Sequence, residues 1–263
     1  MTDVCGSRPF DRDAVREAYD RDGFVVVRGL FTPTDILAAG AEADGLLVSH
    51  AHLKDVDNLR CRWRDDVTTG TCTFETFDPV CDIAPACRGL ALAERLLDLL
   101  AAVYGEPACL FKDKLIYKPP GLAGYGLHQD WIAWPGFPRS FLTVLVPLDA
   151  ADSHNGCTIV YPGLHHRGPL TPEDGDYHEL AADLVGESRP TPLELDLGDV
   201  ALFSGFTPHR SDANLSTRWR RQLYLSYNAF SDGGDRRDRH YAEFHEWLRV
   251  RYAAHGRAST YFA

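Results

Sequence analysis

The stretch GDVALFSGFTPHRSDANLSTRWRRQLYLSYNAF, residues 198–230, contains two apolar runs on either side of a polar segment. The runs 199–204 and 221–229 are rich in aliphatic and aromatic residues, a composition typical of short β-strands. Ser211–Thr217 between them is polar, as expected for a turn. The stretch therefore predicts two strands joined as a hairpin, with the second strand returning beside the first.

The rest of the second half of the chain repeats this pattern of short apolar runs separated by Gly, Pro, Asp and Asn. Four further strands are expected at 108–118, 141–148, 157–161 and 192–196. Helical patterns do not alternate with these runs, which argues against a doubly wound parallel sheet. We therefore expect a mainly β fold with flanking α-helices, in which an antiparallel sandwich or barrel occupies about residues 106–230.

The first part of the chain, about residues 1–105, predicts a helical scaffold. One helix is expected to begin at a cap formed by Asp11 or Asp13 and to end at Gly23, directly before a strand at 24–27. Other helices are expected over Pro33 to about Val48, over 90–104 and, at the C-terminus, over about 239–254.

No linker or repeat divides the sequence, so residues 1–263 are interpreted as a single domain. Residues 165–190 are rich in Gly, Pro, Glu and Asp and predict a long loop. Long loops in compact domains often serve as lids or binding loops.

Charge and hydropathy exclude some classes of partner. The chain has 27 Lys and Arg against 38 Asp and Glu, and this net charge of −11 repels nucleic acid and anionic membrane surfaces. The longest uncharged apolar stretch, Ser140 to Leu148, is far shorter than the roughly 20 residues that cross a bilayer. With no signal segment visible, we expect a soluble cytoplasmic protein that acts on a small-molecule substrate.

The cysteine content argues against a disulfide framework. The seven cysteines are an odd number and include no C-x-x-C pair. We expect buried free thiols at most of these positions, which are Cys5, Cys61, Cys72, Cys81, Cys87, Cys109 and Cys157.

An H-x-D pair lies in the segment Gly124–Trp131. In an extended chain, His128 and Asp130 point to the same side about 6.6 Å apart and can bind one ion, while Gln129 points away. The composition produces about one such pair by chance, so the pair alone is weak evidence.

A second element strengthens the metal hypothesis. The strand that begins after Gly198 leads to His209, which can complete a set of two histidines and one carboxylate on one face of an octahedral ion. Arg220 follows at the start of the returning strand, where a guanidinium can bind a carboxylate with two hydrogen bonds. Arg221 is the alternative, because adjacent strand residues face opposite sides.

Several segments, in order, resemble the phytanoyl-CoA dioxygenase family of iron(II)- and 2-oxoglutarate-dependent oxygenases. The resemblance covers most of the chain, and several motifs in the right order are more specific than any one of them. The matching segments are Tyr19–Leu30, Leu115–Gly121 followed by His128-Gln129-Asp130, Asn155–Cys157 through Tyr161–His165, Gly198–Asp199 with Phe203, and His209–Ser211 with Arg220-Arg221.

The resemblance implies a double-stranded β-helix, a jelly-roll barrel of the cupin type. It implies that His128, Asp130 and His209 bind iron(II). Arg220 would bind the C5 carboxylate of 2-oxoglutarate, to which Ser211 would contribute a hydroxyl. The cofactors implied are iron(II), the cosubstrate 2-oxoglutarate and O2. Because halogenating relatives replace the metal-binding carboxylate with a small residue, the presence of Asp130 favours hydroxylation or another oxidation.

Two lysines and two tryptophans are the candidate contacts of the small ligands. Lys112 and Lys114 alternate along one face of a strand that lines the pocket in relatives, so Lys112 is expected to bind 2-oxoglutarate and Lys114 an anionic group of the substrate. A solvated sheet edge would explain both lysines equally well. Trp131 and Trp134 follow the metal strand and fit a pocket that stacks on a cationic amine, although such aromatic residues are usually core.

Other histidines are interpreted as structural. His165 and His166 follow Pro162-Gly163 and are expected in a turn. His240 and His245 are five residues apart and diverge on a helix, which favours surface positions.

These observations predict an enzyme, an iron(II)- and 2-oxoglutarate-dependent dioxygenase that hydroxylates an unactivated C–H bond of a small polar metabolite. The lysines and the acidic chain together favour a zwitterion such as an aminoalkylphosphonate. One alternative is an oxygenase that tailors a natural-product intermediate, with desaturation or ring closure as outcomes. Others are a non-catalytic sensor that binds metal and 2-oxoglutarate, and a zinc hydrolase with the same ligands.

Overall fold

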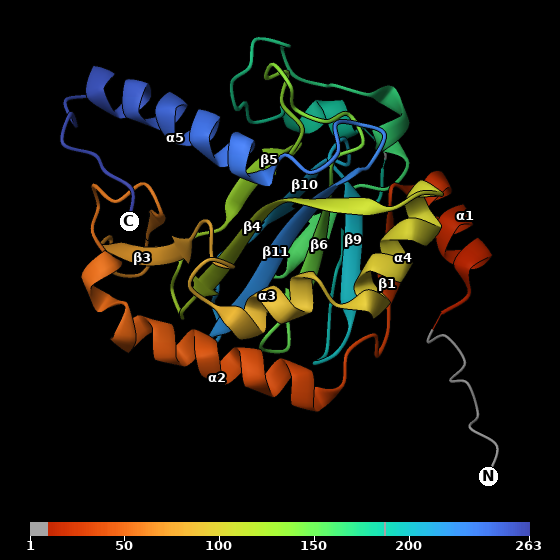
Figure 1. Ribbon diagram of the computed structural model, residues 1–263, viewed down its shortest axis with the longest axis horizontal. Coiled ribbons are helices and arrows are strands. Elements are labelled where there is room, and N and C mark those ends of the chain that lie inside the picture. The colour runs from red at the N-terminus through yellow and green to blue at the C-terminus, as the bar shows by residue number, and fades with distance from the viewer. Residues whose placement is uncertain (1–9, 187) are drawn as a thin grey trace.

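The computed structural model describes residues 10–186 and 188–263, which form two antiparallel sheets flanked by helices (Figure 1). In spatial order, the seven-stranded sheet contains β1 (Phe24–Val27), β9 (Val200–Ser204), β6 (Leu142–Pro147), β11 (Arg220–Ala229), β4 (Ala108–Lys118), β3 (Cys72–Phe77) and β2 (Cys61–Asp65). The four-stranded sheet contains β5 (Tyr125–His128), β10 (His209–Ser211), β7 (Thr158–Val160) and β8 (Thr191–Pro192). The mainly β architecture with flanking helices is therefore confirmed.

The helices cover the outer face of the large sheet and one of its ends. Figure 1 shows α2, α3 and α4 on the near side of the strands, and α5 beside β4 at the opposite end. The helices are α1 (Arg12–Asp22), α2 (Pro33–Ser49), α3 (Pro85–Ala91), α4 (Glu94–Tyr104) and α5 (Arg237–Ala254). Among the helices of the described residues, none has both the length and the apolar composition needed to cross a bilayer.

Local sequence signals fix the ends of the first two helices. The Asp11 carboxylate accepts hydrogen bonds from the backbone N–H groups of Asp13 and Ala14, and α1 ends at Gly23 in the left-handed conformation at φ 77°. Thr32 and Asp35 form a reciprocal capping box at the start of α2. Both helices therefore begin where the sequence predicted, and α1 ends at the expected glycine.

The two central strands separate the hydrophobic core from the interior of the barrel. Leu115 and Leu223 pack toward the helices in the large core, whereas Ile116 and Tyr224 belong to the smaller core between the two sheets. Alternation along paired strands then gives the interior face a polar row. The pairs along this row are Lys112 with Ser226, Lys114 with Tyr224, Ile116 with Gln222, and Lys118 with Arg220.

Four expectations about secondary structure need correction. The strands predicted as a hairpin, β9 and β11, are not neighbours, because β6 lies between them and pairs with both. The predicted strand 192–196 is reduced to β8, and Leu195 makes only an isolated bridge to Ala151. The predicted helix 90–104 is split into α3 and α4, because the backbone of Ala93 is extended. The N-terminal scaffold also contributes β2 and β3 to the large sheet. The predicted loop 165–190 contains two short 3-10 turns, η2 (Leu164–Arg167) and η3 (Ala182–Val185), and a third, η1 (Ala51–Leu53), follows α2.

The cysteines of the described residues are all free thiols. Four are buried, Cys72 is exposed and Cys109 is partly buried. Cys5 lies outside the described residues. The expectation of buried free thiols thus holds at Cys61, Cys81, Cys87 and Cys157.

Candidate metal and cosubstrate site

Three side chains from two distant stretches of the chain converge in the barrel. His128 ends β5 and His209 begins β10, and the two residues are paired across the small sheet. The Nε2 atom of each histidine lies 3.7 Å from Oδ1 of Asp130. One ligand atom from each of the three residues lies within 4.8 Å of the others, which is the arrangement needed to hold one metal ion.

Hydrogen bonds behind these residues set their orientation. The Nδ1 of His128 donates to the carbonyl oxygen of Gly126 at 2.7 Å, and that of His209 donates to the carbonyl of Thr207 at 3.0 Å. Both Nε2 atoms are therefore left as acceptors toward the metal position. The hydroxyl of Thr143 donates to Oδ2 of Asp130 at 2.7 Å, which leaves Oδ1 directed at the histidines.

The close approach of the strands that carry the histidines depends on a glycine. A Cβ at Gly124 would collide with the carbonyl oxygen of Ser211 on β10. A side chain there would separate β5 from β10 and pull His128 away from His209. The close pairing of β5 with β10 therefore requires a glycine at position 124, before the H-x-D segment.

The charges of the three residues suit a divalent cation. Burial opposes a charge on Asp130, yet His209 and His128 hold the pKa of this carboxyl well below its usual range. Burial, together with the neighbouring His128, lowers the pKa of His209 to about 4. At neutral pH the site thus offers a carboxylate and at least one neutral imidazole, as metal binding requires.

A buried arginine and a buried lysine lie side by side in the barrel, and neither forms an ion pair with any other described residue. Arg220 is 2% exposed; its Nη1 donates to Gln222 Oε1 at 2.7 Å and to the Tyr224 hydroxyl at 3.2 Å, and its Nε has no partner. Lys118 lies beside it, and burial and then Arg220 lower the pKa of Lys118 to about 6. Within the described ranges, neither side chain forms an ion pair with an acidic residue. An anionic group bound here would pair with the Arg220 guanidinium and would favour the charged form of Lys118, whose amine already donates to Ser211 and to two backbone carbonyls.

A cavity of about 40 Å³ lies at the three metal-binding candidates and reaches Ser211 and Tyr224, which contact Lys118 and Arg220. Its lining includes Ser211, Thr158 and Tyr224, together with His128, Asp130 and His209. Ser211 Oγ is within 3.3 Å of Lys118 Nζ. The hydroxyl groups and the buried guanidinium suit the far carboxylate of a short dicarboxylic acid whose other end reaches the metal.

The structure also distinguishes Arg220 from its alternative. Arg221 points to the opposite side of β11, where its guanidinium donates to both oxygens of Asp149 at 2.8 Å and to Asp44 at 2.6 Å. This side chain is already neutralised by carboxylates. Arg220 is the arginine placed in the barrel interior.

A second and larger cavity, of about 410 Å³, is lined by His128 and Asp130 but not by His209. Lys114 lines both cavities, whereas Lys112 lines only the larger one. Lys112 Nζ is 3.0 Å from Asp78 Oδ2 and 3.8 Å from the centre of the Phe244 ring. Lys112 lies away from the small cavity and is not placed to bind 2-oxoglutarate there, whereas Lys114 lines both cavities and its expected role toward the substrate stays a prediction.

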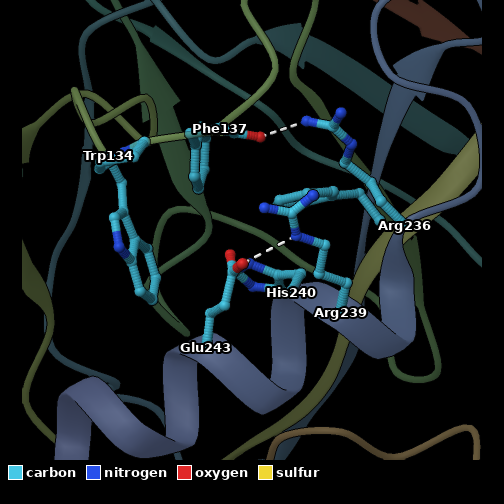
Figure 2. Close-up of a pocket in the computed structure, with 9 residues that line it drawn as sticks. Trp134, Phe137, Arg236, Arg239, His240 and Glu243 are labelled. Atoms are coloured by element: carbon cyan, nitrogen blue, oxygen red, sulfur yellow. Dashed lines mark hydrogen bonds and ion pairs between the residues drawn. The ribbon is translucent and has the colours of Figure 1, made fainter.

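The two tryptophans do not line either cavity. Trp131 is buried against Phe141 and Phe206, and its Nε1 donates to the carbonyl of Pro138 at 3.1 Å. Figure 2 shows Trp134 across from α5, where it lines a separate cavity of about 10 Å³, barely enough for a water molecule. The aromatic cage expected from these two residues is absent from the described site, and both act as packing residues.

The histidines outside the site behave differently from one another. His165 lies in η2, in agreement with the expected turn, and its ring is close to Tyr19. His240 and His245 are both 6% exposed, which corrects the expectation of surface positions. The helix packs against other parts of the chain at both positions, because the ring of His240 contacts Phe111 of β4 and the ring of His245 contacts Phe262 near the C-terminus.

Sequence reasoning missed several residues of the site. Thr143 and Tyr224 contact predicted site residues, but a lone Thr or Tyr in a buried strand gives no signal of such a role. Tyr177, from the expected lid loop, places its ring 5.3 Å from that of His128. The loop itself was recognised by its composition, but its contact with the metal site depends on the tertiary fold.

Comparisons with known proteins agree with this geometry. The sequence is 40% identical over 157 residues to a methylphosphonate hydroxylase from Gimesia maris, a match that covers 59% of this chain and 58% of that protein. It is 36% identical over 170 residues to a 2-aminoethylphosphonate dioxygenase from an uncultured bacterium, covering 64% of this chain and 62% of that protein. Both matches span less than two thirds of the relative's length.

Solved structures share the fold. EctD from S. alaskensis, crystallised with 2-oxoglutarate and 5-hydroxyectoine, matches with a TM-score of 0.71 at 26% identity, over 88% of this chain and 79% of that one. The barrel and the His-Asp-His arrangement are the features of the iron(II)- and 2-oxoglutarate-dependent oxygenases. The chain belongs to the phytanoyl-CoA dioxygenase (PhyH) family, whose sequence profile matches residues 19–222. The family and the double-stranded β-helix predicted from the sequence are thus confirmed.

Proposed function

We propose that this protein is an iron(II)- and 2-oxoglutarate-dependent hydroxylase of a small organophosphonate, with an aminoalkylphosphonate as the favoured substrate. The observation that carries the proposal is the His-Asp-His group beside two cavities, the smaller of which is lined by Ser211 and Tyr224, the contacts of the buried Lys118 and Arg220. The names of the two relatives, which act on methylphosphonate and 2-aminoethylphosphonate, support the substrate class.

In this proposal, His128, Asp130 and His209 hold the iron, and Thr143 fixes the carboxylate. The donor set fits iron(II), because two imidazoles and one carboxylate on one face leave three positions for other ligands. When bound, iron and 2-oxoglutarate activate O2 and oxidise a substrate C–H bond, with succinate and CO2 as coproducts.

Arg220 and Ser211 bind and orient 2-oxoglutarate by its C5 carboxylate. Arg220 is held by Gln222 and Tyr224, so its guanidinium is positioned before the cosubstrate arrives. Its unpartnered Nε atom supports this role, because a buried donor without an acceptor is costly. A hydrolytic zinc site would have no use for this buried cation.

The larger cavity binds the substrate. The loop that carries Tyr177 covers the part of this cavity next to the metal position. Asp176 beside Tyr177 is bound by Arg251 of α5 at 2.6 Å, which holds the loop against the body of the protein. The loop thereby keeps water from the reacting C–H bond. We also infer a reducing, cytoplasmic setting, which the free thiols of the described residues favour.

The test is succinate release from purified protein with iron(II), 2-oxoglutarate and O2. Methylphosphonate, 2-aminoethylphosphonate, ectoine and an acyl-CoA are compared, and the phosphonate product is identified by mass. We expect stimulation by a phosphonate and none in the His128→Ala variant. Stimulation by ectoine or the acyl-CoA alone would reject the proposed substrate class.

A further inference from the structure

Buried hydrogen-bond donors without partners gather on one wall of the larger cavity. Arg62 Nη2, Trp63 Nε1 and Thr76 Oγ1 are all buried and have no hydrogen-bond partner in the part of the chain that the structure describes. All three residues line this cavity. A buried polar group left unsatisfied costs about 1–3 kcal/mol, so three together on one wall point to a ligand that satisfies them.

Lys114 adds a fourth donor to this wall. Its ammonium lies 5.3 Å from the centre of the Tyr224 ring. It makes no hydrogen bond or ion pair within residues 10–186 and 188–263. Because Lys114 lines both cavities, it connects the wall to the metal position.

The acidic residues of the same cavity leave these donor atoms without a hydrogen bond, although Asp78 forms an ion pair with Arg62. Asp78 is engaged by Lys112 at 3.0 Å and by the Tyr241 hydroxyl at 3.0 Å, and lies 3.7 Å from Arg62 Nη2, beyond hydrogen-bond distance. Glu75 is engaged by Arg64 at 3.1 Å and by the Tyr125 hydroxyl at 2.6 Å. The basic residues that line the cavity are thus matched in number by Glu75, Asp78, Asp130 and Glu179, and what remains on the wall is a set of donor atoms without hydrogen bonds to other described residues.

We propose that Arg62, Trp63, Thr76 and Lys114, here called the oxyanion wall, bind the phosphono group of the substrate. This inference rests on the proposed function. A phosphono group presents three oxygens, each able to accept more than one hydrogen bond, and so matches four donors better than a carboxylate does. Because Lys114 lines both cavities, it holds the phosphono group close to the metal position. The carbon attached to phosphorus is then the part of the substrate nearest the iron.

The carboxylate of Glu179, in the loop 165–190, binds the other end of the substrate. Glu179 also lines the larger cavity, and its side chain makes neither a hydrogen bond nor an ion pair within the described part of the chain. Its carboxylate lies so close to Gly126 that a side chain at that glycine would collide with it. Glu179 pairs with an ammonium group at the far end, and thereby favours 2-aminoethylphosphonate over methylphosphonate.

The experiment measures binding by calorimetry to anaerobic protein loaded with iron(II) and 2-oxoglutarate, so that no turnover occurs. The probes are 2-aminoethylphosphonate, methylphosphonate and 3-aminopropionate, the carboxylate analogue. Thr76→Val keeps the side-chain shape but removes the donor, and Thr73→Val on the same strand, outside the cavity, is its matched control. Lys114→Met is paired with Lys54→Met.

Thr76→Val and Lys114→Met are expected to weaken phosphonate binding about 10-fold or more, as loss of a hydrogen bond to a charged group predicts. The two controls are expected to bind as the wild type does. Glu179→Gln is expected to reduce the preference for 2-aminoethylphosphonate over methylphosphonate about 10-fold.

Wild-type affinity in both Thr76→Val and Lys114→Met would overturn the oxyanion wall and leave the proposed function intact. Equal affinity for 3-aminopropionate and 2-aminoethylphosphonate would overturn it as well. If the wild type binds neither phosphonate, the proposed substrate class fails, and the wall fails with it. Unchanged melting temperatures show that the variants are folded.

Discussion

Thr143 provides a direct test of how the metal site is organised. Its hydroxyl is buried and donates to Asp130 Oδ2 at 2.7 Å, and its only other side-chain neighbour within hydrogen-bond range among the described residues is Ser226 at 3.4 Å. A hydrogen bond to a charged group contributes about 1.5–3 kcal/mol. Thr143→Val, which keeps the shape of the side chain, should therefore weaken metal binding about 10- to 100-fold.

The assay is an anaerobic titration of metal-free protein with iron(II), with the cobalt(II) form as a spectroscopic check of coordination. Thr73→Val is the control, because Thr73 lies outside both cavities. Unchanged melting temperatures exclude a folding defect. A dissociation constant for Thr143→Val within about twofold of the wild type would refute the idea that this hydroxyl orients Asp130.

Three other predictions concern the cosubstrate, the pH dependence and the loop. Arg220→Gln should raise the KM for 2-oxoglutarate about 30-fold or more, since removal of a buried charge contact costs about 2 kcal/mol or more; steady-state succinate assays measure it. Burial lowers the pKa of His240 from 6.5 to about 3, so the folded state binds fewer protons than the unfolded state and loses about 1.5 kcal/mol as the pH falls from 6.5 to 5. Because His245 and His209 also have lowered pKa values, the wild type should lose more than this, and urea denaturation should show a loss about 1.5 kcal/mol smaller in His240→Leu. Tyr177→Ala should expose the metal position and increase the succinate released per molecule of hydroxylated product; equal coupling would argue against the loop's role.

Local signals explain which parts of the fold were predictable. The caps at Asp11 and Thr32 bind nearby N–H groups, so sequence alone places them. Alternation and turn residues likewise place the central strands. In contrast, β2 and β3 pair through contacts that no local pattern encodes, and the hydrophobic periodicity continued across Ala93 although the helix did not.

The site was predictable to the extent that its chemistry is confined to short motifs. The H-x-D spacing and the strand ending at His209 gave the three metal-binding candidates, and Arg220 followed from its offset. Of the proposed oxyanion wall, Lys114 was expected to meet an anionic substrate group, but Arg62 and Thr76 were not predictable, because they come from strands that are paired only in the folded protein. Trp134 and His240 were misjudged for the same reason, since α5 packs against the loop after β5.

Visible absorption of the anaerobic iron(II) protein during addition of 2-oxoglutarate probes the proposed centre without any turnover. We expect a charge-transfer band whose maximum intensity corresponds to one iron per chain. The band should disappear in His209→Ala, and in Arg220→Gln it should require a higher concentration of 2-oxoglutarate. An absence of the band in the wild type, or an identical band in His209→Ala, would contradict a single iron site formed by His128, Asp130 and His209.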